Sequence, residues 1–276
     1  MVFDEYGDGE QLIVYMHGLL IDSDINRGIA KALADRGNRV VLLDLLGHGR
    51  SDKPTHASAY RIDAYSDQVF ALLDELGVEE AVLGGMSLGA NVSLFAGSRQ
   101  PRRVRGMVLE MPVLEWATPP SALLFASLLL LVRYGRTPAR WVSSLVRSLP
   151  ETRYALINSL LHAAALPPEV MAAILHGVLV GPVAPTQEER AGINAPALVL
   201  AHGNDVIHPF DDAANLVARL PHAQIFRARS PIELRLRPDR LTDVIAAFVK
   251  DVWARPRNGE AEPVPAHQTR AHDHAG

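Results

Sequence analysis

The sequence contains no cysteine among its 276 residues. Disulfide bonds and metal sites built on thiolates are therefore excluded, and cysteine usage says nothing about the redox compartment. Basic side chains are scattered rather than clustered: 27 Lys and Arg stand against 31 Asp and Glu, for a net charge of −4. Without a basic block, the sequence does not favour a nucleic-acid partner.

Long apolar runs are also missing. The most apolar stretch, residues 122–132, is too short to span a bilayer and contains Ser127. We therefore expect no stable membrane insertion. The stretch could contact a membrane surface or roof a lipophilic pocket, and the second arrangement is the commoner one. Residues 1–5 have neither a basic start nor an apolar signal core, so we expect a cytoplasmic protein.

Strand and helix patterns alternate over the first 111 residues. Apolar runs typical of buried strands lie at 12–16, 39–44, 81–83 and 104–110. Such alternation predicts a parallel sheet covered by helices on both faces. Residues 2–6 predict a short edge strand. A hairpin turn at 7–9 would then place it beside the strand at 12–16.

The pattern changes between residues 112 and 192. Leu- and Ala-rich helical pieces are broken there by prolines, which predicts an all-helical cap inserted into the α/β core. The α/β pattern resumes after residue 193, so the core comprises residues 1–111 and 193–254. Residues 255–276 are almost free of apolar side chains, and we expect them to form a disordered tail.

The stretch Gly85-Met86-Ser87-Leu88-Gly89 lies between a predicted strand and a predicted helix. This context predicts a strained turn that presents the Ser87 hydroxyl at the carboxyl edge of the sheet. Small residues two positions before and after Ser87 are needed, because larger ones would collide across the turn. The N–H of Leu88 then points toward the same spot. The alternative interpretation is an ordinary glycine-rich turn with a serine at its helix start.

Four motifs in matching order resemble the α/β-hydrolase superfamily over residues 2–254. They are the segments 17–19, 44–51, 85–89 and 202–209. The resemblance implies an α/β-hydrolase fold with a mostly parallel sheet and a helical cap. Only sixteen residues precede His17, so we expect the sheet to begin at the family's second strand.

The resemblance also implies roles for particular residues. Ser87 would be the nucleophile, and the N–H groups of Leu19 and Leu88 would form the oxyanion hole. Asp205 would orient a catalytic histidine. Three further residues are candidates for lining the substrate pocket: His17, Met86 and His48.

The catalytic histidine itself does not match. The family places it in the loop after the last strand, where Pro231 occupies its position, and no histidine lies between His222 and His267. We therefore expect Ser87 to lack its usual proton acceptor. His17 or His48 could replace it, although both belong to ordinary loop motifs.

Four other side chains are weaker candidates for the base. His208 follows Asp205 by three residues, and we expect it to cap or pack within its loop. His162 and His176 are expected on the cap surface or in its core. Glu233 is expected to be a surface charge among neighbouring arginines.

These observations favour an enzyme that acts on a small, largely apolar carbonyl compound, by ester, thioester or lactone hydrolysis. The alternative is a non-hydrolytic relative that binds a ligand or assists a biosynthetic step. No phosphate-binding loop, dinucleotide fingerprint or metal-ligand spacing is present, so we expect neither cofactor nor metal. A small molecule is the expected partner, and the sequence leaves the oligomeric state open.

Overall fold

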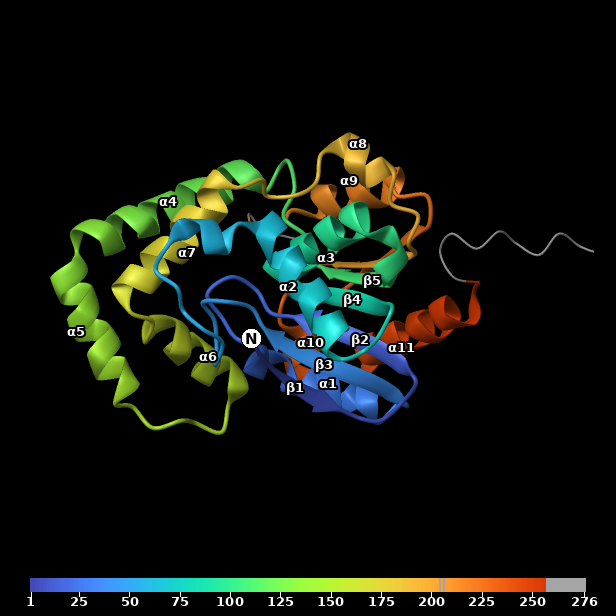
Figure 1. Ribbon diagram of the computed structural model, residues 1–276, viewed down its shortest axis with the longest axis horizontal. Helices are drawn as coiled ribbons and strands as arrows, with labels where there is room; N and C mark the ends of the chain where they lie inside the picture. The colour runs from blue at the N-terminus through green and yellow to red at the C-terminus, as the bar shows by residue number, and fades with distance from the viewer. Residues whose placement is uncertain (204, 206, 257–276) are drawn as a thin grey trace, which may run out of the picture.

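The computed structural model describes residues 1–203, 205 and 207–256 (Figure 1). Within this part of the chain, seven strands form one sheet in the order β1-β3-β2-β4-β5-β6-β7. The strands are β1 (Val2–Tyr6), β2 (Gln11–Met16), β3 (Asn38–Asp44), β4 (Ala81–Met86), β5 (Val104–Glu110), β6 (Ala197–Ala201) and β7 (Ala223–Arg227). All neighbours are parallel except β1, which runs antiparallel to β3. The mostly parallel α/β sheet is therefore confirmed.

The N-terminal strand corrects one expectation. β1 is an edge strand, but it pairs with β3 and not with the strand that contains Leu12. β2 cannot accept it, because β3 and β4 occupy both of its edges. Gly7 and Gly9 carry the chain across the start of β3, where an added Cβ would lie 2.3 Å from the Asn38 carbonyl oxygen and 2.0 Å from that of Gly37. This connection is a crossing, and the predicted hairpin is wrong.

Helices cover both faces of the sheet, as the continuous apolar strands require. On one face lie α1 (Arg27–Ala34), α10 (Glu233–Leu236) and α11 (Asp239–Ala254), in the hydrophobic cluster that contains Ile13 and Tyr15 of β2. On the other lie α2 (Ile62–Glu75), α3 (Leu88–Arg99) and α9 (Phe210–Arg219), in the cluster that contains the alternate β2 residues Leu12, Val14 and Met16. The predicted final helix at 239–254 matches α11.

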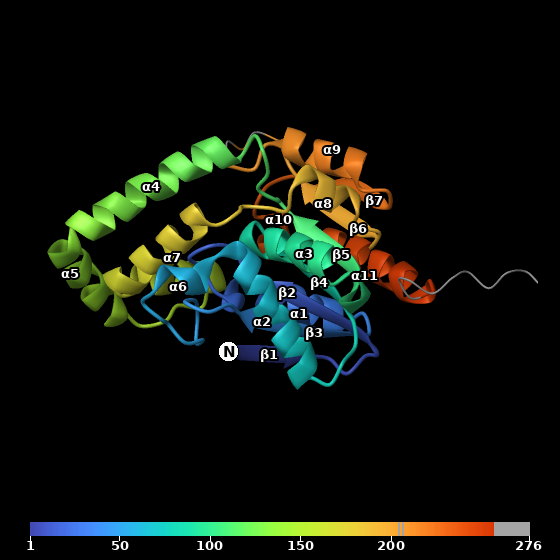
Figure 2. The ribbon, with the colours of Figure 1, turned by 45° about the horizontal axis from the view of Figure 1, so that its top comes forward.

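Between β5 and β6, the described chain holds helices and no strand. They are α4 (Thr118–Tyr134), α5 (Arg136–Arg147), α6 (Ala155–Ala164), α7 (Pro168–Val180) and α8 (Gln187–Ala191). Figures 1 and 2 show α4 to α7 projecting as an arc from one end of the sheet, with α5 at its outer rim. The division at residues 112 and 192 stays a prediction, and most of the predicted tail, residues 257–276, lies outside the described residues.

No single helix in the described chain is long and apolar enough to cross a bilayer. Two bent pairs, α4 with α5 and α6 with α7, meet that test of length and composition only when each pair is taken together.

Candidate active site

Ser87 lies between β4 and α3 with a backbone φ of 52°, in the left-handed region that side chains other than glycine rarely adopt. Its N–H donates to the carbonyl oxygen of Glu110, 2.8 Å away. Gly85 and Gly89 face each other across the turn, and a Cβ on Gly85 would lie 2.9 Å from the Gly89 Cα. Glycine is therefore needed at both positions, and this geometry exposes the Ser87 hydroxyl.

The loop after β6 brings Asp205 and His208 to this turn. Oδ2 of Asp205 lies 3.0 Å from Nδ1 of His208, and Nε2 of the same ring lies 3.1 Å from Oγ of Ser87. Oδ1 of Asp205 accepts hydrogen bonds from the backbone N–H groups of Ile207 at 2.8 Å and His208 at 3.2 Å. One carboxylate thus holds both the loop and the ring, and carboxylate, imidazole and hydroxyl form a continuous row.

This row corrects the expectation that Ser87 lacks an imidazole partner. His208 was expected to cap or pack within its loop, and its ring instead reaches the Ser87 hydroxyl. The loop can do this because Asp205 binds the backbone two and three residues ahead, which folds the segment into a tight turn. The spacing Asp-x-x-His is the sequence signal that could have revealed the arrangement. Pro231 lies exposed in the loop after β7.

The segment after Pro231 has a structural task of its own. Glu233 is buried, with 7% of its side chain exposed in the ion pair with Arg240, so its expected role as a surface charge is wrong. Arg235 is also buried and donates to Glu110, whose other carboxylate oxygen accepts from Tyr15 at 2.8 Å. Because Ser87 donates to the Glu110 backbone, this ion pair anchors the strand that supports the elbow.

The charge on Asp205 is stabilised by its surroundings. Burial opposes the charge, but the hydrogen bond from His208 and the N–H group of Ile207 outweigh it. Together they hold the pKa of the Asp205 carboxyl below its ordinary value. An ionised Asp205 favours the tautomer of His208 that carries its proton on Nδ1, which leaves Nε2 as an acceptor toward Ser87.

His17 and His48 are both fully engaged with backbone groups. Nδ1 of each ring lies within 2.9 Å of a carbonyl oxygen, and Nε2 of each accepts a backbone N–H at 3.1 Å. Burial lowers the pKa of His17, and burial with the nearby His17 lowers the pKa of His48 to about 3. Both rings are therefore neutral at physiological pH. They bond the loops after β2 and β3 and leave no nitrogen free for Ser87.

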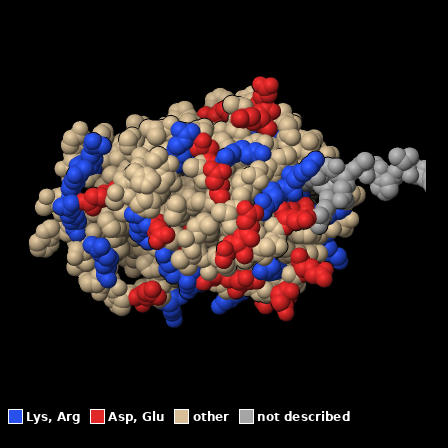
Figure 3. All heavy atoms as spheres, in the orientation of Figure 1, with Lys and Arg blue, Asp and Glu red and all other residues tan. Residues whose placement is uncertain are grey.

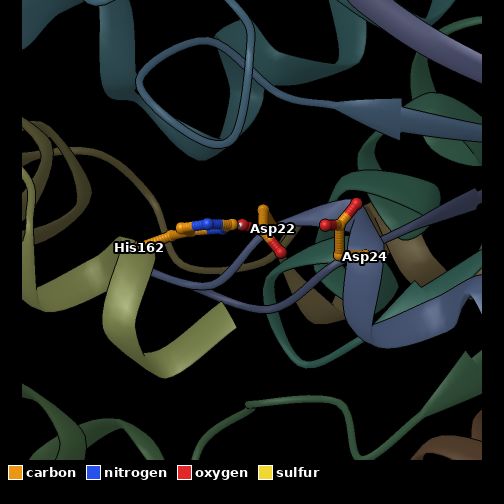
Figure 4. A group of neighbouring side chains, drawn as sticks. All are labelled: Asp22, Asp24 and His162. Atoms are coloured by element: carbon orange, nitrogen blue, oxygen red, sulfur yellow. Dashed lines mark hydrogen bonds and ion pairs between the residues drawn. The ribbon is translucent and has the colours of Figure 1, made fainter. Parts of the chain in front are cut away.

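His162 joins the helical segment to the core. Figure 4 shows its ring directed at Asp22, with Asp24 on the far side. Its Nδ1 lies 2.6 Å from Oδ2 of Asp22, and Ser159 donates to Oδ1 at 2.8 Å. The three acidic and imidazole groups are close enough to hold a cation, but Asp24 is already paired with Arg27 at 2.7 Å. These hydrogen bonds hold α6 against the loop after β2. His176 is exposed on α7.

A cavity of about 280 Å³ opens beside Ser87 and His208. Leu19, Leu88 and Met86 line it, whereas His17 and His48 do not. Leu88 is the first residue of α3, so its N–H has no carbonyl partner one turn earlier. The remaining lining is mostly apolar, with side chains from the core, α4 and α7: Ile21, Ile62, Val113, Phe125, Val178 and Leu179.

A family model described as the alpha/beta hydrolase fold matches residues 11–171, more than half of the chain. The protein therefore belongs to the α/β-hydrolase family. It is 33% identical over 112 residues to a haloalkane dehalogenase from Mycolicibacterium paratuberculosis; the match covers 40% of this chain and 37% of that relative. The chain thus spans little more than a third of the length of that curated relative.

Two solved structures have the same fold. An esterase from Thermogutta terrifontis superposes with a TM-score of 0.71 at 23% identity, covering 91% of this chain and 93% of its own. An enol-lactonase from Burkholderia xenovorans superposes with a TM-score of 0.71 at 19% identity, covering 90% and 96%. At these identities the likeness to the two structures concerns the fold alone. The family expected from the four motifs is confirmed by the family model that matches residues 11–171.

Proposed function

We propose that this protein hydrolyses an ester-type bond, in an ester, thioester or lactone, with Ser87 as nucleophile and His208 as general base. The observation that carries the proposal is the row of contacts from Asp205 through His208 to Ser87, at 3.0 and 3.1 Å. These distances lie within the range over which a positioned base takes a proton from a hydroxyl. The reaction needs no cofactor.

In the proposed mechanism, Nε2 of His208 takes the Ser87 proton as Oγ attacks the substrate carbonyl carbon. The oxyanion that forms accepts hydrogen bonds from the N–H groups of Leu19 and Leu88. His208 then donates its proton to the leaving group, and an acyl-Ser87 ester remains. Water, deprotonated by the same ring, hydrolyses this ester and restores the hydroxyl. Asp205 holds the ring and stabilises its charged form.

The cavity supports a small, largely apolar substrate. At about 280 Å³ it accommodates a short acyl group, and its polar lining side chains are Ser87, Asn91, Thr118, Ser121 and His208 among mostly apolar ones. Asn91 is itself engaged, because its amide nitrogen donates to the carbonyl oxygens of Val113 and Val183 at 2.7 Å. A substrate with several charged groups would therefore lose hydration without replacement.

We also propose that the protein acts in the cytoplasm.

The test compares wild type with Ser87→Ala, His208→Ala and Asp205→Asn on short-chain p-nitrophenyl esters. His176→Ala is the matched control, since His176 is an exposed histidine outside the cavity. We expect kcat to fall by about 10³-fold or more in Ser87→Ala and His208→Ala, and by about 10²-fold or more in Asp205→Asn. His176→Ala should match wild type.

A fluorophosphonate probe supplies a second readout. It should label wild type and His176→Ala, and it should fail to label Ser87→Ala. If wild type is as slow as Ser87→Ala and takes no label, the hydrolytic proposal is wrong. The non-hydrolytic alternative, a ligand-binding relative or a non-covalent catalyst in a biosynthetic pathway, would then be favoured.

A further inference from the structure

The outer surfaces of α4 and α5 expose an unusual amount of apolar side chain. Six large residues there are between 54% and 83% exposed: Leu123, Leu130, Leu131, Tyr134, Trp141 and Leu145. We call these six residues the α4–α5 face. The α4 members follow helical spacing, so they share one side of that helix. A contiguous exposed apolar surface of this kind on a folded protein marks an interaction site.

The same segment carries positive charge only. Between Glu115 and Glu151 the sequence holds Arg133, Arg136, Arg140 and Arg147 and no acidic residue, although the whole chain carries a net charge of −4. Arg140 pairs with Glu169, but the other three form no salt bridge within the described residues. Figure 3 shows basic side chains over the end of the molecule formed by α5, whereas basic and acidic side chains are mixed over the sheet. Arg133 and Arg136 thus flank Tyr134 at the junction of α4 and α5, whereas Arg147 lines a second cavity together with Asp22 and Asp24.

The arrangement of the two helices suits a flat contact. α4 and α5 meet at 96° and form the outer rim of the projecting helical segment in both ribbon views (Figures 1 and 2). Neither helix alone can span a bilayer. Trp141 and Tyr134 are the most exposed members of the face, at 78% and 83%, and such side chains favour the boundary between headgroups and acyl chains.

We infer that the α4–α5 face docks onto the surface of an anionic lipid bilayer. Its apolar side chains would enter the interface while the arginines contact the acidic headgroups, as in amphipathic surface-binding helices. A second copy of this chain is a poorer occupant. A two-fold contact through this face would bring the unpaired arginines of both copies together without opposing carboxylates.

The face adjoins the cavity beside Ser87. Leu124, in the same helix, is 48% exposed and also lines the cavity, together with Phe125. A docked protein would therefore place one wall of the cavity near the acyl region of the membrane. This link to catalysis rests on the proposed function, whereas the docking itself does not.

Vesicle flotation tests the docking. It compares binding to phosphatidylcholine vesicles with binding to anionic vesicles that contain both phosphatidylcholine and phosphatidylglycerol. We expect binding to the anionic vesicles only, and we expect high salt to weaken it. Arg133→Gln with Arg136→Gln should weaken partitioning about 30-fold. Trp141→Ser with Leu145→Ser should weaken it about tenfold or more. Ser87→Ala should bind like wild type, so that loss of the hydrolytic proposal would leave this result unchanged.

Matched controls separate the face from general surface effects. Leu236→Ser removes an apolar residue that is 63% exposed outside the face, and Arg102→Gln with Arg219→Gln removes two exposed charges elsewhere. Both controls should bind like wild type. The inference is overturned if neither vesicle binds, if lipid charge makes no difference, or if the controls weaken binding equally. A dimer in solution that Trp141→Ser with Leu145→Ser dissolves, without vesicle binding, would instead assign the face to a second copy.

Discussion

Nε2 of His208 lies 3.1 Å from Oγ of Ser87, and the two residues are 121 positions apart in the chain. The ring reaches the hydroxyl from the loop after β6, the loop that also supplies Asp205. Nucleophile and imidazole are therefore joined without any residue from the loop after β7.

A histidine at position 231 should add little activity. Pro231 is exposed, and the segment that follows it is held by the buried Glu233 and Arg235. We expect Pro231→His to keep kcat/KM within about threefold of wild type, and Pro231→His with His208→Ala to remain as slow as His208→Ala. Steady-state ester hydrolysis checks both. Rescue of His208→Ala by the second histidine would show that the loop after β7 can still supply the base.

The protein should become less stable as the pH is lowered, because the imidazole of His48 is buried in its neutral form. The folded protein holds the pKa of His48 at about 3, mainly through burial, below the value of about 6.5 in an unfolded chain. His48 therefore contributes its full stability above about pH 6.5, and that contribution is lost as the unfolded chain takes up a proton at lower pH. Between about pH 6.5 and pH 5 the loss is about 2 kcal/mol.

Urea unfolding at neutral and mildly acidic pH measures this loss. His48→Gln should be less stable than wild type at neutral pH, but its stability should fall less on acidification, by about 2 kcal/mol. His176→Gln is the control, because it replaces an exposed histidine and should fall as wild type does. Equal slopes for His48→Gln and wild type would contradict the assignment.

Substitution by alanine should change the free energy of unfolding in opposite directions at two glycines that lie in helices. A Cβ on Gly177 in α7 would lie 2.3 Å from the Ala57 carbonyl oxygen, whereas a Cβ on Gly28 in α1 meets nothing within 4 Å. Gly177→Ala should therefore lower the free energy of unfolding by about 1–3 kcal/mol, despite the better helix propensity of alanine. Gly28→Ala should raise it by about 0.5–1 kcal/mol. Urea titration measures both changes, and an unchanged stability of Gly177→Ala would contradict the close approach of α7 to Ala57.

Asp22 should control how firmly α6 is held. Asp22→Asn replaces the carboxylate whose Oδ2 lies 2.6 Å from His162 Nδ1 with an amide group. This change weakens the hydrogen bond between α6 and the loop after β2. We expect faster trypsin cleavage at Arg147 and Arg153, in the segment that precedes α6, with the sheet core left intact. Asp24→Asn should leave the cleavage rate unchanged, because the salt bridge that Asp24 forms is with Arg27, its neighbour in the chain, and not with a residue of α6. Equal rates for the two variants would contradict this role.

The sequence by itself determined the class of fold. Continuous apolar strands separated by helical patterns can bury both faces only in a covered parallel sheet, and this requirement is local. The Ser87 turn was equally predictable, because a Cβ on Gly85 would collide with Gly89 inside the five-residue turn; the close approach of Met16 in β2 to both glycines adds a restriction that the turn alone does not show. The final helix at 239–254 was recovered because its amphipathic pattern is contained within those residues.

Only the tertiary structure decided which imidazole lies beside Ser87. The Asp-x-x-His spacing is compatible with the turn around Asp205, but the position of His208 also depends on the approach of the β6 loop to the end of β4, which local spacing does not specify. The same holds for β1, whose partner is β3 because both edges of β2 are already occupied. Glu233 was expected to be a surface charge, but it is buried in an ion pair with Arg240, and the neighbouring Arg235 pairs with Glu110, 125 positions earlier in the chain. Long-range pairing of this kind is set by packing and charge compensation in three dimensions, where local sequence patterns carry no signal.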